Sequence, residues 1–459
     1  MKTVELLLAA CVAAAPLAAQ QPAAPAAVPA AAVSSASAAL AEMQRANSED
    51  YHAVMQALLG EHKLAEIPAA MEQMAAAGEP AALLWCARRE ITALVAANAD
   101  MSTAPRAVKA RAMVADAAKK GYVPAMVELA RFAAVGFGLP ADDKAGKQIL
   151  TEACKKGSSR ARAAYLLVTD RLADPSKFDA PEIVSELKKG NFYLEEIIAS
   201  LYGDDPRALT WLKRAAEHGS AQAPYIITQA FAPEISAQEF RDNLMLAVER
   251  HHPEALALLG LMQAMGDEST VPRDREAALK NLELAAALGA RTGLIALAMR
   301  YHGDPEHYSA EEEFELYRCG MELGEVTPAV SYAYCLTVGH GCTADAAKGI
   351  ELLKKLADAG QPYAMVALAS CCYNGSGMEP DVRRAVDYLG QASSAGVPGL
   401  YAVMAALTEM GNSAAKPDAR RAAVYLKMAE EQEGPAARAA YDFILKNKAW
   451  SFLDGNGSW

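Results

Sequence analysis

Residues 361–396 read QPYAMVALASCCYNGSGMEPDVRRAVDYLGQASSAG, and this stretch decides the fold. Its first half has small and apolar residues at helical spacing and runs into Gly375-Ser-Gly377. Its second half, which follows Asp381, has a bulky residue eight positions before Gly396 and small residues three and four positions before it. These positions fall on one helical face. The stretch therefore predicts two amphipathic helices joined by a glycine-rich loop, with Gly396 ending the second.

The same pattern recurs along most of the chain. Glycines that close alanine-rich amphipathic stretches follow one another with a mean spacing of about 36 residues, and His252 stands in the glycine's place in one repeat. Since one pair of short helices cannot bury its apolar stripe alone, we expect ten to eleven antiparallel helix pairs stacked into one elongated core. The closing glycines are Gly78, Gly121, Gly157, Gly190, Gly219, Gly289, Gly324, Gly360, Gly396 and Gly434.

The glycines have predictable structural roles. Each closing glycine is expected to adopt the left-handed conformation at a helix C-terminus, where a Cβ would be penalised. The pairs Gly136/Gly138, Gly339/Gly341 and Gly375/Gly377 follow helices rather than strands, so they are predicted to be structural loops and not phosphate cradles. We expect Asp143, Asp345 and Asp381 to cap the helices after these loops.

Composition excludes several classes of protein. The 459 residues carry a net charge of −12, which does not suit a nucleic-acid-binding face. Strand-forming residues are sparse and aromatic residues make up only 7%, so an all-β fold is not expected. No apolar run beyond the N-terminus is long enough for a transmembrane span.

The repeat resembles the Sel-one-like repeat, a relative of the tetratricopeptide repeat. The resemblance is carried by Lys213-Arg-Ala-Ala-Glu-His-Gly219 and by Gly375-Ser-Gly-Met-Glu-Pro-Asp381, covers about 64–450, and is weakest at 158–252. It implies an all-α, right-handed superhelical solenoid that serves as a non-catalytic scaffold or adaptor for other proteins.

The ends of the chain differ from the repeats. Lys2, the apolar run Leu6–Ala15 and the small residues up to Ala19 predict an export signal over 1–19, and hence a periplasmic or secreted protein. An alternative is a lipid anchor on Cys11. The remaining predicted segments are an Ala/Pro-rich tether at 20–38, N-terminal capping helices at 39–60, Sel-one-like repeats at 61–450 and a disordered tail at 451–459.

Binding residues are predicted on the helix that follows each closing glycine. Positions 4, 8 and 11 after the glycine are mostly apolar, whereas positions 3, 7, 10 and 14 vary, as the lining of a concave surface would. Of these, Arg131, Gln229, Tyr334 and Ser370 share position 10 and are predicted to form one row along a groove. The candidates are Glu128, Arg131, Tyr193, Gln222, Gln229, Tyr334, Tyr363 and Ser370.

Other chemistry is largely absent from the sequence. No common catalytic motif occurs, and His302 and His307 lack a third ligand, so we expect no catalytic residue, metal or cofactor. A cysteine-rich branch of the family pairs a cysteine at the position of Cys154 with a second cysteine eight residues later, where this chain has Arg162. The alternative function drawn from that branch is a cell-wall-associated hydrolase or a binder of cell-wall precursors. The partner expected for the main function is a protein or peptide with some basic surface.

Overall fold

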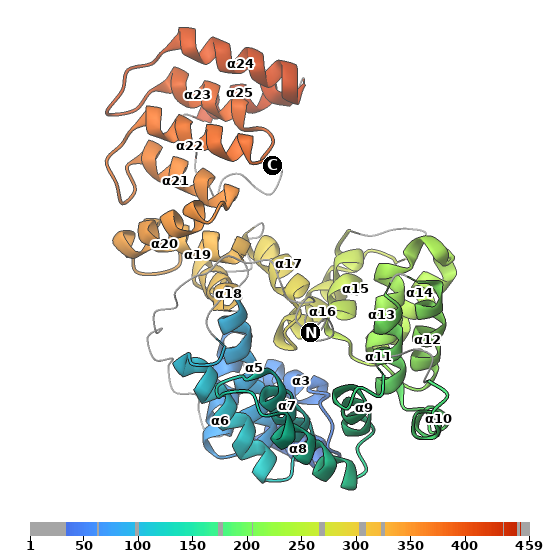
Figure 1. Cartoon of the computed structure of the whole chain (residues 1–459). Helices are drawn as coiled ribbons and strands as arrows, with labels where there is room; N and C mark the ends of the chain where they lie inside the picture. Colours follow the sequence, from blue (N-terminus) through green and yellow to red (C-terminus); the bar gives the residue numbers. More distant parts are fainter. Residues whose placement is uncertain are drawn as a thin grey trace. The chain divides into compact units, whose positions relative to one another are not determined.

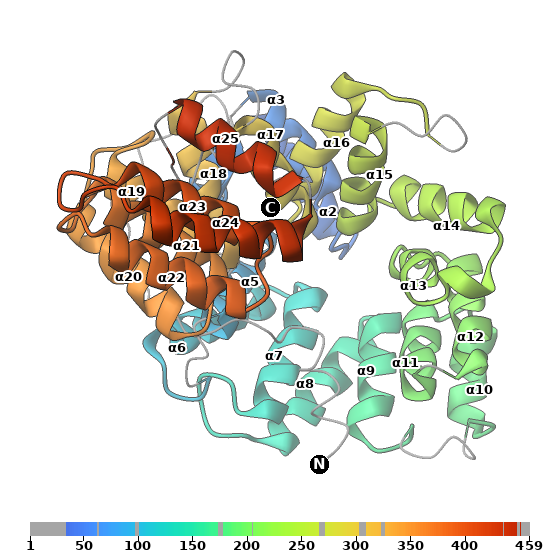
Figure 2. The same ribbon diagram turned by 90° about the horizontal axis from the view of Figure 1, so that it is seen from above.

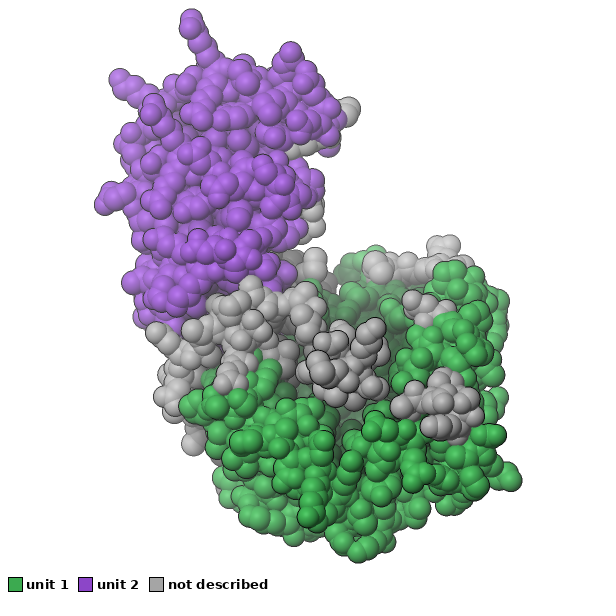
Figure 3. Space-filling model, in the orientation of Figure 1, with its two compact units in different colours: residues 1–11, 21–95, 99–296 green, residues 12–20, 96–98, 297–459 purple. Residues whose placement is uncertain are grey.

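The computed structural model describes residues 34–61, 64–96, 101–172, 178–203, 205–265, 271–302, 309–322, 326–434, 436–447 and 450. The predicted segments 1–19 and 451–459, most of the tether, Cys11 and Gly324 lie outside these residues. Within them the chain forms two compact units, unit 1 at 34–95 and 101–296 and unit 2 at 96 and 297–450 (Figure 3).

Unit 1 is built of short helices joined by tight turns (Figure 1). The last of its helices, α17, crosses into unit 2 at residue 297. In chain order they are α2 (Ser34–Arg45), α3 (His52–Glu61), the 3-10 turn η3 (Leu64–Glu66), α4 (Ile67–Ala76), α5 (Pro80–Ala96), α6 (Pro105–Lys119), α7 (Val123–Val135), α8 (Asp143–Lys155), α9 (Ser159–Val168), α10 (Pro181–Lys188), α11 (Phe192–Tyr202), α12 (Pro206–Glu217), α13 (Gln222–Ala230), the 3-10 turn η5 (Ala232–Glu234), α14 (Ala237–Glu249), α15 (Pro253–Met265), α16 (Arg275–Ala287) and α17 (Arg291–His302).

Unit 2 continues the same pattern of paired helices. Its further helices are α18 (Ala310–Glu322), α19 (Val326–Val338), α20 (Ala346–Asp358), α21 (Pro362–Asn374), α22 (Val382–Ser394), α23 (Leu400–Met410), α24 (Ala419–Glu433) and α25 (Ala436–Asn447). From α5 onward we call the odd-numbered helices, which follow a closing position, A helices and the even-numbered ones B helices. The all-helical solenoid is confirmed, while its handedness and its exact number of repeats stay predictions.

Closing glycines with positive φ follow α4 and most B helices, although Gly434 after α24, with ψ −163°, does not adopt the predicted left-handed helical conformation. All nine described ones have φ between 69° and 107°. At Gly360 the glycine N–H donates to the Ala357 carbonyl at 2.9 Å, and the next N–H, of Gln361, donates to the Leu356 carbonyl at 3.0 Å. This is the double hydrogen bond of a Schellman motif, which satisfies carbonyls at the helix end. It reverses the chain in about two residues, so the next A helix starts at once.

Two positions differ from the prediction by one residue. In the repeat without glycine, His251 takes the left-handed conformation, with φ 62°, and not His252. The N–H groups of His251 and His252 make the same two hydrogen bonds, to Val248 and Ala247. Similarly, α8 is capped by Asp142 rather than Asp143, because the Asp142 carboxylate accepts from the Ala145 N–H at 2.9 Å. Asp345 and Asp381 do cap α20 and α22.

The second glycine of each Gly-x-Gly loop lies against the B helix of the preceding repeat. A Cβ on Gly138 would lie 2.8 Å from the Ala107 carbonyl oxygen of α6, and a Cβ on Gly341 would overlap the Ala310 carbonyl oxygen of α18. Both glycines also have positive φ. The loops are therefore packing elements between neighbouring repeats, as the sequence predicts.

The N-terminal helices pack on two distant parts of unit 1. One continuous core joins Leu40 of α2 and Met55 of α3 to α4–α6 and to Leu256 of α15 and Ala285 of α16. Figure 2 shows α2 and α3 beside α16, about 200 residues further along the chain. Helix α2 begins at Ser34 and buries Ala36, so the tether predicted to reach residue 38 ends before Ser34.

Alanine substitutions at three glycines separate backbone strain from steric overlap. Gly360→Ala should lower the free energy of unfolding by about 1–2 kcal/mol, because its surroundings are open and only the left-handed backbone is penalised. Gly341→Ala should cost at least twice as much, because a carbonyl oxygen occupies the space of its Cβ. Gly390→Ala, inside α22 with its Cβ 4.0 Å from Met404 Cε, should be neutral or stabilising. Urea denaturation checks the order, and equal losses at all three positions would contradict it.

Candidate functional site

In unit 1, the polar face of the A helices holds the loop between α2 and α3. Glu49 of this loop forms an ion pair with Arg88 of α5 at 2.8 Å and a second with Arg160 of α9. Near the start of α7, the Tyr122 hydroxyl donates to the Ser48 carbonyl at 2.6 Å. Three successive A helices thus converge on the same acidic loop, which we call the N-terminal loop (residues 46–51).

The charge of Glu49 is stabilised by its two arginines. Burial raises the pKa of its carboxyl, but the nearby guanidinium groups of Arg88 and Arg160 more than offset this, so that the pKa lies below its ordinary value. The Arg160 guanidinium also lies over the Tyr193 ring, 5.7 Å from its centroid. The cluster therefore joins the N-terminal loop to the repeats by charge as well as by apolar packing.

Part of the predicted binding row is exposed and part is buried. Arg131, which pairs with Glu128, and Gln229 are exposed in unit 1. In unit 2, Tyr334 and Ser370 are buried and their side-chain oxygens lie 3.0 Å apart. These two residues belong to the core and cannot line an open groove, so their prediction is wrong. The two side chains contact each other between the neighbouring helices α19 and α21, and the sequence pattern does not show this contact.

The remaining candidates have different surroundings. Glu128 is buried and is not an exposed binding residue. Tyr193 is partly buried beside Arg160, and Gln222 is exposed and lies 3.2 Å from His252 Nε2 through its Oε1. Tyr363 is exposed on α21. The structure does not bring these residues into one site.

Three charged residues of the cluster were missed, although two had a signal in the sequence. Arg88 stands ten residues after Gly78 and Arg160 three after Gly157, which are positions that the sequence analysis marks as variable and polar. Glu49 lies in the N-terminal helix pair, outside the repeats, and no periodicity points to it.

His251 and His252 perform two different tasks. The His251 ring stacks on the His52 ring with centroids 3.5 Å apart, and its Nδ1 lies 2.8 Å from an Asp50 carboxylate oxygen. His252 is buried and caps α15, since its Nδ1 accepts from the Ala255 N–H at 3.3 Å. Burial lowers the pKa of His252 to about 4, and the capping role requires the neutral ring.

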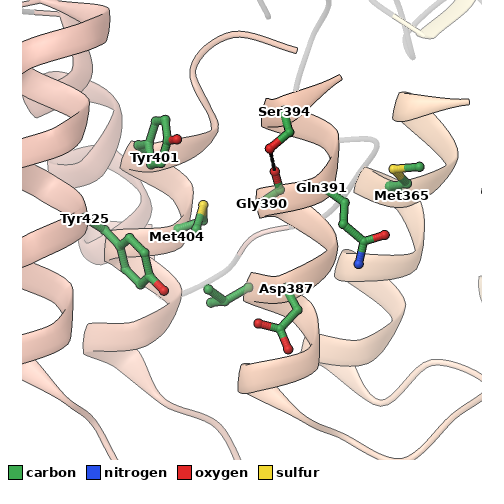
Figure 4. Close-up of a pocket in the computed structure, with 9 residues that line it drawn as sticks. Met365, Asp387, Gly390, Gln391, Ser394, Tyr401, Met404 and Tyr425 are labelled. Atoms are coloured by element: carbon green, nitrogen blue, oxygen red, sulfur yellow. Dashed lines mark hydrogen bonds between the residues drawn. The ribbon is translucent and has the colours of Figure 1, made fainter. Parts of the chain in front are cut away.

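An open cavity of about 670 Å³ lies in unit 2, across four consecutive helices (Figure 4). Tyr401 and Met404 of α23 and Tyr425 of α24 lie on one side of α22, and Met365 of α21 lies on the other. Helix α22 itself contributes Val386, Asp387, Gly390, Gln391 and Ser394. We call this cavity the α22 groove.

The α22 groove is suited to binding rather than to catalysis. Among the residues that the structure describes, its lining contains no histidine and no cysteine. Its one aliphatic hydroxyl, on Ser394, donates to the Gly390 carbonyl at 2.9 Å in the same helix. No side chain in the groove is therefore placed to activate a nucleophile. Phenol rings and thioethers, with a few polar groups, are typical of a protein-binding surface.

The cysteines and acidic residues form no further site in the described part of the chain. Cys86, Cys335, Cys371 and Cys372 are buried free thiols, and burial raises the pKa of Cys86 and of Cys371 to about 12. Cys154 is also a free thiol. Across the described residues no three His, Cys, Asp or Glu side chains are grouped to hold a metal ion. None of the described helices has the length and apolar character to cross a membrane.

The comparisons with known proteins agree with the repeat pattern. The model of the Sel1 repeat matches six segments, at 123–158, 197–220, 253–289, 329–361, 362–397 and 402–433. No curated protein matches the chain.

Among solved structures, the chain is similar to a protective antigen of uropathogenic Escherichia coli with an SLR fold, with 15% identity over 91% of this chain and 92% of that one and a TM-score of 0.48. It is also similar to a Sel1 repeat protein from Oxalobacter formigenes, with 19% identity over 64% and 87% of the two chains and a TM-score of 0.38.

Removing the charge of Glu49 should destabilise unit 1. Glu49→Gln leaves Arg88 and Arg160 near each other without their carboxylate, and we expect a loss of about 1–3 kcal/mol in the free energy of unfolding. The matched control is Glu72→Gln, which breaks the more exposed pair with Arg89 and should cost about 0–1 kcal/mol. Urea denaturation of both variants checks this. An equal, small loss of unfolding free energy in the two variants would show that the cluster does not stabilise the fold.

His252 should make the stability depend on pH. Its folded pKa of about 4 lies below its ordinary value of 6.5, so the unfolded chain binds the proton first as the pH falls between these values. Stability should therefore drop by about 2–3 kcal/mol from pH 7 to pH 4.5 on account of this group.

His252→Asn is the variant that tests this, because Asn191 already caps α11 from the same position after its closing glycine. Urea denaturation at both pH values should show a smaller loss in the variant than in the original protein. A variant as sensitive to acid as the original would exclude His252 as the cause.

Proposed function

This chain is a Sel1 repeat protein, and from that membership we propose that it is a non-catalytic scaffold of the bacterial envelope that binds a segment of another protein. The observation that carries the proposal is the α22 groove, an open surface whose side chains can bind but are not arranged for catalysis. Proteins of this family are typically protein-interaction scaffolds, and stacked repeats supply long surfaces for that purpose.

Two features of the chain support the finer parts of the proposal. The export signal predicted at 1–19 supports the envelope location. The position of the groove across α21–α24 supports a segment of a folded or extended protein as the ligand, because four helices from two repeats contribute to it. The alternative of the cysteine-rich type loses support, since Cys154 is a free thiol in the described part of the chain.

Photo-crosslinking in cells tests the proposal. The photoreactive residue p-benzoylphenylalanine replaces Gln391, which is exposed and lines the groove. Irradiation should yield a discrete adduct with another protein, recovered in the envelope fraction. The matched control places the same residue at Lys355, the equivalent position one repeat earlier, which does not line the groove.

The outcomes separate the parts of the proposal. An adduct at Gln391 but not at Lys355 supports binding in the α22 groove. The same adducts at both positions would mean unspecific contact, and no adduct at either would remove the groove from the proposal. An adduct in the cytosolic fraction alone would overturn the envelope location.

A further inference from the structure

The α22 groove has an unbalanced charge. Among the described residues that line it, Asp387 alone is charged, and it is exposed. No ion pair or hydrogen bond of the Asp387 carboxylate occurs in the part of the chain that the structure describes. The groove thus presents one negative group that its own lining does not neutralise.

The preceding repeat shows what has changed at these positions. The capping residues Asp345 and Asp381 are 36 residues apart, so α20 and α22 can be compared position by position. In α20, Glu351 is paired with Lys355 at 2.6 Å. In α22 the carboxylate is kept as Asp387, but the lysine is replaced by Gln391.

A second lysine is lost beside the first. Lys354 of α20 corresponds to Gly390 of α22. A Cβ on Gly390 would lie 4.0 Å from Met404 Cε, with nothing closer, so the glycine leaves space in front of the methionine. Of these two differences, Gly390 leaves space beside Met404, and Gln391 stands where α20 has the lysine that pairs with the equivalent carboxylate.

The walls of the groove suit a long basic side chain. Thioethers and phenol rings, here those of Met365, Met404, Tyr401 and Tyr425, favour the aliphatic stem and the cationic end of arginine or lysine. Arg421 already lies over the Tyr425 ring, at 5.6 Å from its centroid, and donates to the Tyr425 hydroxyl at 3.0 Å. That hydroxyl keeps its own proton to donate to a main-chain carbonyl of a bound segment.

We propose that the α22 groove receives an arginine or lysine side chain of the partner protein, with the Asp387 carboxylate as its ionic partner. Met365 and Met404 contact the stem of this side chain, and Gly390 provides the space for it. The inference rests on the proposed function only in attributing the basic side chain to a protein.

Methionine methyl resonances provide a direct test. The full chain is labelled with ¹³C in the methionine methyl groups, and Met365 and Met404 are assigned by substitution with leucine. The probe is Nα-acetyl-arginine methylamide, and the comparison probe is its citrulline counterpart, which has nearly the same shape without the charge. The arginine probe should shift the two signals saturably, in the millimolar range, and the citrulline probe should bind about three- to fivefold more weakly.

Three variants localise the effect. Asp387→Asn should weaken binding of the arginine probe about three- to fivefold and abolish the preference over citrulline. Gly390→Phe should remove the shifts by filling the groove. Glu351→Gln, which changes the equivalent carboxylate one repeat earlier, should leave them unchanged. Since Asp387 is exposed, Asp387→Asn is expected to fold. It therefore decides the test even if Gly390→Phe fails to fold.

Equal binding of the two probes, or undiminished binding to Asp387→Asn, would overturn the inference. These results are distinct from those of the crosslinking experiment. A protein adduct at Gln391 without arginine binding would leave the scaffold function standing and refute the basic side chain. Arginine binding without any adduct would support the chemistry of the groove and count against a protein partner.

Discussion

Every helix pair in this protein depends on the next one to cover its apolar face. Because neighbouring pairs must therefore lie close together, the turns between them can be only a few residues long. A residue with positive φ meets this requirement after each B helix whose end the structure describes, and at His251 it does so without glycine. The exception has a physical reason in the structure: the His251 side chain contacts Asp50 and stacks on His52, which glycine could not do.

The stacking leaves one face of the A helices outside the apolar core, and it does not determine what packs on that face. In unit 1 the N-terminal loop lies on this face, bound by Arg88 and Arg160. In unit 2, Tyr334 and Ser370, at the corresponding position, are buried against each other. A residue on this face can therefore be exposed to solvent, covered by another segment or buried against a neighbouring helix. Its surroundings in the folded chain decide which.

This explains why the fold was predictable and the site was not. Closing glycines and small residues repeat because they satisfy the same contacts in each repeat, and so their period predicts the helices. Glu49 has no counterpart in the repeats, and its partners lie 39 and 111 positions away in the sequence. The one-residue error at His252 arose because both histidines had a role, and only the backbone shows which is left-handed. The sequence shows that α22 lacks the two lysines of α20. Only the structure shows that Tyr401 and Tyr425 line a groove together with the residues that replace them.

Exposed positions of a repeat protein can change without loss of the stacking that holds it together. Lys354 and Lys355 are at the surface of α20, where they add little to stability, and their replacement in α22 by Gly390 and Gln391 costs the core nothing. What the replacement alters is the surface, where the carboxylate of α22 lacks the lysine that pairs with its counterpart in α20 and a glycine leaves space beside the buried Met404. In a solenoid whose core residues recur in every repeat, a binding surface is therefore best sought where one repeat departs from its neighbours at exposed positions. The α22 groove is such a place, and the row of equivalent positions that the sequence first suggested is not.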